Sequence, residues 1–148
     1  MTTTVRRATP ADTEEAAAVY TAGFASMTFV PQLHSAEEHR EFVRTLIENK
    51  ETWVAERDGQ ITGIACIDGG WLEQLYVHPS RHNSGTGAKL FQALTERHHN
   101  GFQLWTFQAN AGARRFYERH GCALVRLTDG ADNEEKTPDA LYVWPAPE

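Results

Sequence analysis

Two strand-like segments, joined by a glycine-rich turn and a helix, occupy the middle of the chain and constrain its fold more than any other feature. The runs "WLEQLYV" at 71–77 and "FQLWTFQ" at 102–108 have the content of strands, whereas Leu90, Phe91 and Leu94 recur at helical spacing. A helix that connects two neighbouring strands of one sheet requires those strands to run parallel. The sequence therefore predicts an α/β fold with a parallel strand pair.

The flanking segments also alternate between strand and helix patterns. Strands are predicted before Pro10, as an antiparallel three-strand meander over 53–77, and at 102–108, 122–128 and 140–145. Helices are predicted after Asp12, after Ser35, over 85–99 and over 111–120. We expect a single α/β domain over residues 1–148, with four helices and a mixed, mostly antiparallel sheet of about seven strands.

Two of the predicted helix starts have the spacing of a capping box, which pairs Asp12 with Glu15 and Ser35 with Glu38. In such a box the first side chain accepts a hydrogen bond from the third helical amide, and the second side chain reaches back. Gly121 has the position of a C-terminal stop for the last helix.

Composition argues against several classes of partner. The net charge is −6 and the 14 Lys and Arg residues are scattered, so we expect no nucleic-acid partner. No apolar run reaches the length of about 18 residues that a membrane-spanning helix needs, and the N-terminal segment lacks the apolar core of a secretion signal. Cys66 and Cys122 have no disulfide-framework or metal-ligand spacing. The sequence predicts a cytoplasmic protein with no membrane partner and no metal.

The segment "HPSRHNSGTGAKLF" at 78–91 places two glycines directly before the central helix. Leu90 stands where a dinucleotide-binding fingerprint needs its third glycine, and the segment lacks the Gly-Lys-Ser or Gly-Lys-Thr of a P-loop. What remains is a short Gly-x-Gly loop, whose backbone N–H groups at a helix start could hold a pyrophosphate. An ordinary glycine turn is the alternative, and the motif alone does not distinguish the two.

"LYVHPSRHNSGTGAKLF" at 75–91 and "NAGARRFYERHGC" at 110–122 together resemble the GNAT superfamily of acyl-CoA-dependent N-acetyltransferases. The resemblance covers most of the chain and implies a single-domain GNAT-like fold whose fourth and fifth strands splay apart. One departure is His82, which stands where the family usually has Gln or Arg.

The resemblance also implies where acetyl-CoA would bind. Its pantetheine arm would hydrogen-bond to the backbone of Leu75, Tyr76 and Val77, and His82 stands at the position whose side chain grips the phosphates in the family. The pyrophosphate would rest on the N–H groups of Asn83, Ser84, Gly85, Thr86, Gly87 and Ala88. Asn110 would contact the cofactor arm, although a helix N-cap explains the same residue.

The implied reaction transfers an acetyl group to a primary amine by direct attack in a ternary complex. Tyr117 is implied as a cofactor contact and as the acid that protonates the departing thiolate. For the developing negative charge, we expect a backbone N–H near Val77, freed by a bulge, to be the donor. The alternative is a catalytically weak acyl-CoA-binding or regulatory module, which the change at His82 would favour.

A base must also take a proton from the acceptor ammonium, because only the free amine attacks a thioester. Glu73 is the candidate, since regular alternation along the strand would put it on the same side as Leu75 and Val77. Apolar neighbours there would desolvate the carboxylate and raise its pKa. A water relay, His78 and His34 are the alternatives.

The acceptor is expected to bind between the loop at 23–35 and the loop at 129–139. Five carboxylates in the second loop would favour a cationic amine, although a solvated turn has the same composition: Asp129, Asp132, Glu134, Glu135 and Asp139. An apolar wall is expected from Phe24, Met27, Phe29, Trp71 and Trp105. Small molecules, aminoacyl groups and peptide N-termini all fit this description. The last strand is expected to be exposed, where it could pair across a homodimer.

Overall fold

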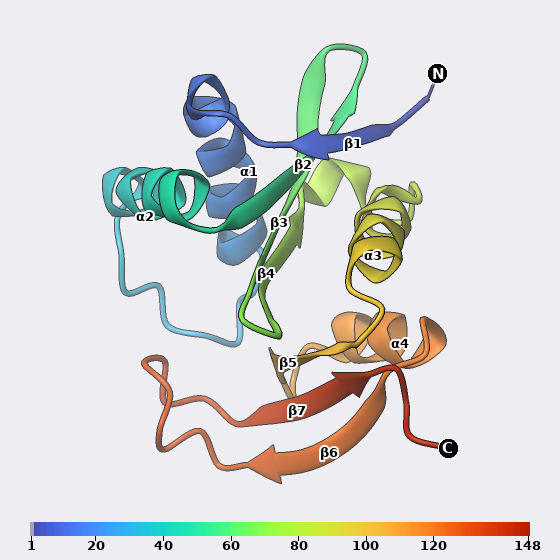
Figure 1. The fold of residues 1–148 in the computed structure, drawn as a ribbon. Helices are drawn as coiled ribbons and strands as arrows, with labels where there is room; N and C mark the ends of the chain where they lie inside the picture. The colour runs from blue at the N-terminus through green and yellow to red at the C-terminus, as the bar shows by residue number, and fades with distance from the viewer. Residues whose placement is uncertain (1) are drawn as a thin grey trace.

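The computed structural model describes residues 2–148, which form one seven-stranded sheet with helices on both faces (Figure 1). The strands are β1 (Thr4–Arg7), β2 (Glu51–Arg57), β3 (Gln60–Asp68), β4 (Trp71–Val77), β5 (Phe102–Phe107), β6 (Ala123–Thr128) and β7 (Asp139–Trp144). The helices are α1 (Thr13–Ala25), α2 (Ala36–Asn49), α3 (Thr86–Arg97) and α4 (Ala111–Arg119), with short 3-10 turns at Pro10–Asp12 and Pro79–Arg81. The predicted fold class and element order are confirmed.

The sheet order is β1-β2-β3-β4-β5-β7-β6, and every neighbouring pair is antiparallel except β4 and β5. These two strands pair only at Trp71 with Gln103 and at Leu72 with Leu104. Beyond that point β4 continues beside β3 and β5 continues beside β7, so the two strands diverge (Figure 1). The predicted splay is confirmed, and it leaves strand edges without a ladder partner in the middle of the sheet.

A bulge interrupts β4 close to the start of the splay. Gln74 pairs with Cys66 and Leu72 pairs with Ile67, which leaves Glu73 as an extra residue between them. The bulge breaks the alternation on which the prediction for Glu73 depended. Leu75 packs into the core on the α3 and α4 face, whereas the carboxylate of Glu73 meets Lys50 at the end of α2. Glu73 and Leu75 therefore do not share a side.

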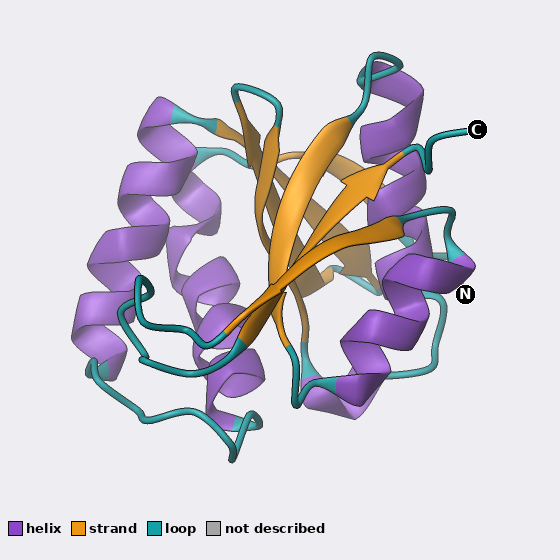
Figure 2. Cartoon of the chain, turned by 90° about the horizontal axis from the view of Figure 1, so that it is seen from below, coloured by secondary structure: helices purple, strands orange, loops and turns teal. Residues whose placement is uncertain are grey.

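Helices α1 and α2 cover one face of the sheet, and α3 and α4 cover the other (Figure 2). The apolar stripe of α3 supplies Leu90, Phe91 and Leu94, all at most 2% exposed, to the second face. Full burial of such a side chain stabilises the fold by about 1.5 to 3 kcal/mol. The helical spacing in the sequence thus specifies which surface of α3 packs on the sheet.

The two predicted capping boxes have different outcomes. Ser35 accepts from the amide of Glu38, and Glu38 accepts from the amide of Ser35, as predicted. Asp12 precedes α1, but its carboxylate accepts hydrogen bonds from Arg6 and from the amide of Thr9 instead of capping the helix. A strong ion pair with Arg6 outcompetes the local cap, so the prediction for Asp12 is wrong in this detail.

The last strand is not at an edge of the sheet. β7 lies between β5 and β6, so the expectation that it is exposed and free to pair across a dimer is wrong. The edge at this end of the sheet is β6, where Leu124, Val125 and Leu127 are 43 to 55% exposed. Within residues 2–148 no helix combines the length and apolarity needed to span a membrane.

Candidate functional site

Three connected cavities surround the splay, and Tyr76 lines all of them. The transfer pocket lies between β4 and β5, has a volume of about 400 Å³ and is lined by Leu75, Thr106 and Tyr117 among others. The cradle pocket continues from it along the start of α3 and the face of α4, and has a volume of about 530 Å³. The acidic groove lies on the opposite side, over α1 and α2, and has a volume of about 680 Å³.

The loop before α3 has the backbone that an anion-binding cradle requires. Asn83 and Gly85 have positive φ angles of 64° and 85°, and Gly85 is the N-cap residue of α3. The amides that follow are at the positive end of the helix dipole and line the cradle pocket. The predicted loop residues at 82, 83 and 85–88 come together here, whereas Ser84 does not line the pocket and bonds to the carbonyl of Arg81 and to Thr86.

His82 connects the cradle to the end of β4. Its Nε2 lies 3.1 Å from the carbonyl oxygen of Val77 and donates to it in the corresponding tautomer. The amide of His78 donates to Thr62 on β3, so by strand alternation the backbone groups of Leu75 and Val77 point away from β3, towards the splay. Those of Tyr76 face β3 instead. Two of the three predicted backbone positions thus have their hydrogen-bonding groups turned towards the gap between β4 and β5.

Two arginines in the cradle pocket are missed by the sequence analysis. Arg115 and Arg119 both line it, together with Arg81. They are one helical turn apart in "RRFYERH", a spacing that puts both on the same face of α4 and could have identified them. They add positive charge beside the helix terminus.

Helix α4 positions Asn110 and Tyr117 on the splay. Asn110 is the N-cap residue, since its Oδ1 accepts from the amide of Ala113 at 3.1 Å. Tyr117, two turns later, is 8% exposed and lines both the transfer and cradle pockets. No group in residues 2–148 hydrogen-bonds its hydroxyl. Burial raises the pKa of Tyr117, so its phenol stays protonated at neutral pH.

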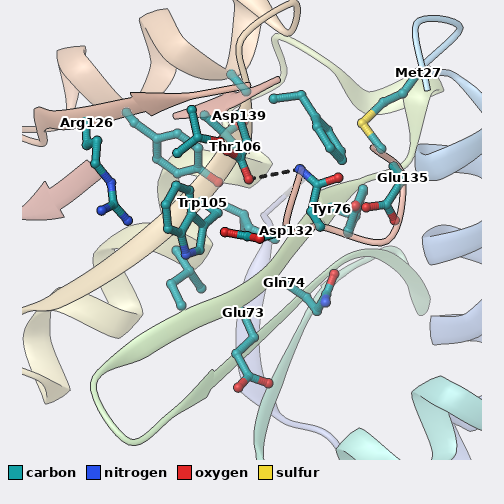
Figure 3. Close-up of a pocket in the computed structure, with 17 residues that line it drawn as sticks. Met27, Glu73, Gln74, Tyr76, Trp105, Thr106, Arg126, Asp132, Glu135 and Asp139 are labelled. Carbon is teal, nitrogen blue, oxygen red and sulfur yellow. Dashed lines mark hydrogen bonds between the residues drawn. The ribbon is translucent and has the colours of Figure 1, made fainter. Parts of the chain in front are cut away.

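Glu73 borders the transfer pocket, but its surroundings differ from those predicted. Its carboxylate is 2.7 Å from the Nζ of Lys50, and the residue is exposed. In Figure 3 it lies apart from the acidic side chains of the β6–β7 loop, with its carboxylate turned away from them. The prediction of a desolvated carboxylate at Glu73 is wrong because the bulge turns it towards α2.

The β6–β7 loop instead brings other carboxylates to the transfer pocket. Asp132, Glu135 and Asp139 line it, and Asn133 donates to Asp139 at 3.1 Å (Figure 3). Glu135 is half-buried beside Tyr76, and no other side chain within residues 2–148 pairs with it. Sequence analysis identified the loop by its charge but did not single out Glu135.

The two histidines considered as bases have other contacts. His78 accepts from Ser80 and caps the turn after β4. His34 bridges Glu38 and Glu134, which links the α1–α2 connection to the β6–β7 loop, and Glu134 followed by Glu38 raises the pKa of His34. His34 lines the acidic groove but not the transfer pocket.

Four of the five predicted wall residues line the cavities. Met27 and Trp105 border the transfer pocket, Phe29 the cradle pocket and Phe24 the acidic groove. Trp71 lines none of the three, because it lies where β4 still pairs with β5.

Comparisons with known proteins show the family to which the chain belongs. The profile of a family described as an acetyltransferase (GNAT) domain matches residues 48–121. The peptidyl-lysine N-acetyltransferase YiaC of Escherichia coli is 31% identical over 100 residues, and the match covers 67% of this chain and 66% of that protein.

Two solved structures show the same fold. The apo form of YjaB from Escherichia coli has a TM-score of 0.79 at 19% identity, over 99% of this chain and 100% of that one. YncA from Salmonella typhimurium, solved with acetyl-CoA, has a TM-score of 0.73 at 18% identity, over 97% of this chain and 92% of that one.

Proposed function

Since this chain belongs to the GNAT family of N-acetyltransferases, we propose that it transfers the acetyl group of acetyl-CoA to a primary amine by direct attack in a ternary complex. The observation that carries the proposal is the position of Tyr117. Tyr117 lines both the cradle pocket and the transfer pocket beside the diverging ends of β4 and β5, and its hydroxyl has no hydrogen-bond partner within residues 2–148.

The residues present fit acetyl-CoA. The positive φ of Gly85 and the amides at the start of α3 suit a pyrophosphate, and Arg81, Arg115 and Arg119 suit further phosphate charge. The backbone groups of Leu75 and Val77 face the splay, where an extended arm could add as a strand. Acetyl-CoA supplies a thioester carbonyl, which a neutral amine attacks.

Tyr117 is proposed to donate its proton to the departing thiolate. Burial raises the pKa of Tyr117, so the phenol is still protonated when the thiolate forms beside it and can hydrogen-bond to the sulfur. The N–H groups of Leu75 and Val77 are the available donors for negative charge that develops on the carbonyl oxygen. Asn110 holds the start of α4 and so positions Tyr117 two turns later.

The proton of the acceptor ammonium is proposed to leave through a carboxylate at the transfer pocket. Glu73, the candidate from the sequence, is engaged by Lys50 and exposed. Glu135 has no cationic partner in the described part of the chain, is half-buried and lies beside Tyr76. We therefore propose Glu135 as the base, directly or through one water, and Glu73 as the weaker alternative.

The test is a screen of amines with acetyl-CoA, in which release of the CoA thiol is measured. The proposed function predicts release with at least one amine and loss of release in Tyr117→Phe. Binding of CoA in a calorimeter without release for any amine would support the binding-module alternative, and absence of CoA binding would refute both.

A further inference from the structure

The acidic groove is larger than acetylation of a small amine with a single charge requires. It continues from the transfer pocket past Gln74, Tyr76 and Glu135, which line both cavities. Beyond them it is enclosed by α2 on one side and by the β6–β7 loop on the other. Its volume of about 680 Å³ exceeds the 400 Å³ of the transfer pocket itself.

Carboxylates dominate the rim of this groove. Six glutamates line it, with no Lys or Arg from residues 2–148 among its lining residues: Glu37, Glu38, Glu41, Glu73, Glu134 and Glu135. Four of them already have partners. Glu38 and Glu134 pair with His34, Glu41 pairs with the arginines of α2, and Glu73 pairs with Lys50. The side chains of Glu37 and Glu135 have no partner in the described residues, so their charge is available to a ligand.

The floor of the groove gives an independent indication of a ligand. Tyr20 is 7% exposed, yet no group in the described chain hydrogen-bonds its hydroxyl. Tyr20 lines the groove, and burial, followed by the charges of Glu135 and Glu134, raises the pKa of its hydroxyl to about 12. The side chain is thus more than nine-tenths buried, while its hydroxyl oxygen is accessible and can hydrogen-bond to a polar group of a ligand in the groove.

Other aromatic rings pack against the ring of Tyr20. Tyr20 packs edge to face against Tyr76 at 5.0 Å between centroids, and Phe42 lies 5.6 Å away on the other side. Trp105 and Phe107 line the opposite wall. Aromatic faces combined with carboxylates are the environment that binds an alkyl chain ending in a cation.

We propose that the acidic groove binds a second positive charge on the acceptor, carried on an alkyl stem several bonds from the amine that is acetylated. The acceptor class is thus a dibasic amine, either a free diamine or a peptide with neighbouring basic side chains. This inference rests on the proposed function for the site of transfer, but the binding subsite can be measured separately.

The test compares cadaverine with pentylamine, which has the same carbon chain and one charge fewer. We expect kcat/KM to be about tenfold higher or more for cadaverine, because a hydrogen bond to a charged group contributes on that scale. A peptide pair, with Lys next to Arg or next to Ala, separates the two sources of the second charge. Equal kcat/KM within both pairs would overturn the inference.

Variants localise the effect. Tyr20→Phe and Glu37→Gln should raise KM for the dibasic acceptor more than they lower kcat. Each should also bring the ratio of kcat/KM for the dibasic acceptor to kcat/KM for the monobasic acceptor towards one. Glu96→Gln on α3 makes the same charge change outside the groove and should leave the ratio unchanged. If no amine releases thiol, calorimetry of cadaverine with the protein still tests the subsite, and binding that Tyr20→Phe does not weaken would refute it.

Discussion

The ring of Tyr20 in α1 meets the ring of Tyr76 in β4 edge to face, with centroids 5.0 Å apart and planes at 75°. Tyr76 lines all three cavities, whereas Tyr20 lines only the acidic groove. Gly23, one turn after Tyr20, leaves room for this contact because it has no side chain. A Cβ at position 23 would be 2.8 Å from the ring of Tyr76. The N-terminal helices therefore help to shape the strand that faces the splay.

Gly23→Ala tests this packing. Alanine in a helix is normally more stable than glycine by about 1 kcal/mol, but here its methyl group must displace the ring of Tyr76. We expect a lower free energy of unfolding in urea and a lower kcat/KM for the acceptor. Combining it with Tyr76→Leu, which removes the opposing ring, should give less destabilisation than the sum of the single changes. Strict additivity would contradict the contact.

Tyr117→Phe tests the proposed acid. The change removes one hydroxyl that has no partner in residues 2–148, so we expect the free energy of unfolding and the Kd for CoA to change little. Turnover should fall by about 10²-fold or more, the usual contribution of a general acid. Thiol release and calorimetry measure the two effects. Full activity in this variant would remove Tyr117 from the mechanism.

Glu135→Gln and Glu73→Gln form a matched pair for the base. Both remove one carboxylate from the border of the transfer pocket, but only Glu73 is neutralised by Lys50. We expect Glu135→Gln to lower kcat by about 10²-fold near neutral pH, with partial recovery at alkaline pH where free amine is abundant. Glu73→Gln should have the smaller effect. The opposite order in the pH–rate profiles would restore Glu73 as the base.

Gly85→Ala tests the cradle, with Gly59→Ala as its control. Both glycines have positive φ, at 85° and 76°, and at neither would a Cβ meet another atom within 4 Å. Each change should therefore cost a similar free energy of unfolding, about 1 to 2 kcal/mol, from backbone strain alone. Only Gly85→Ala should weaken CoA binding in calorimetry. An equal loss in the control would mean that the effect is one of stability.

Asp12 makes the free energy of unfolding depend on pH in the acidic range. The Arg6 guanidinium lowers the pKa of Asp12 from 3.8 to about 2, so its contribution is complete above pH 3.8 and is lost as pH falls through about 2. Arg6 is 39% exposed, and solvent screening reduces the effect to on the order of 1 to 2 kcal/mol. Asp12→Asn should lower the free energy of unfolding by that amount at pH 7. It should also make the free energy of unfolding depend less on pH between these two values. An unchanged acid dependence would contradict the ion pair.

Local patterns predict most of the architecture and the cradle. The helical spacing in α3, the cap at Ser35 and the glycine loop before α3 depend on residues that are close in the sequence, so a linear reading captures them. Asp12 is misread for the same reason, because its partner Arg6 lies on another element and competes with the local cap.

The sequence by itself determined the mixed sheet with its parallel pair, the amide cradle and the position of Tyr117 on the helix that follows. The tertiary structure decided which carboxylates reach the site. A one-residue bulge in β4 turns Glu73 to Lys50, and a loop more than 50 residues later brings Glu135 beside Tyr76. Neither effect has a local signal, because a bulge reverses strand alternation and long-range packing positions a loop.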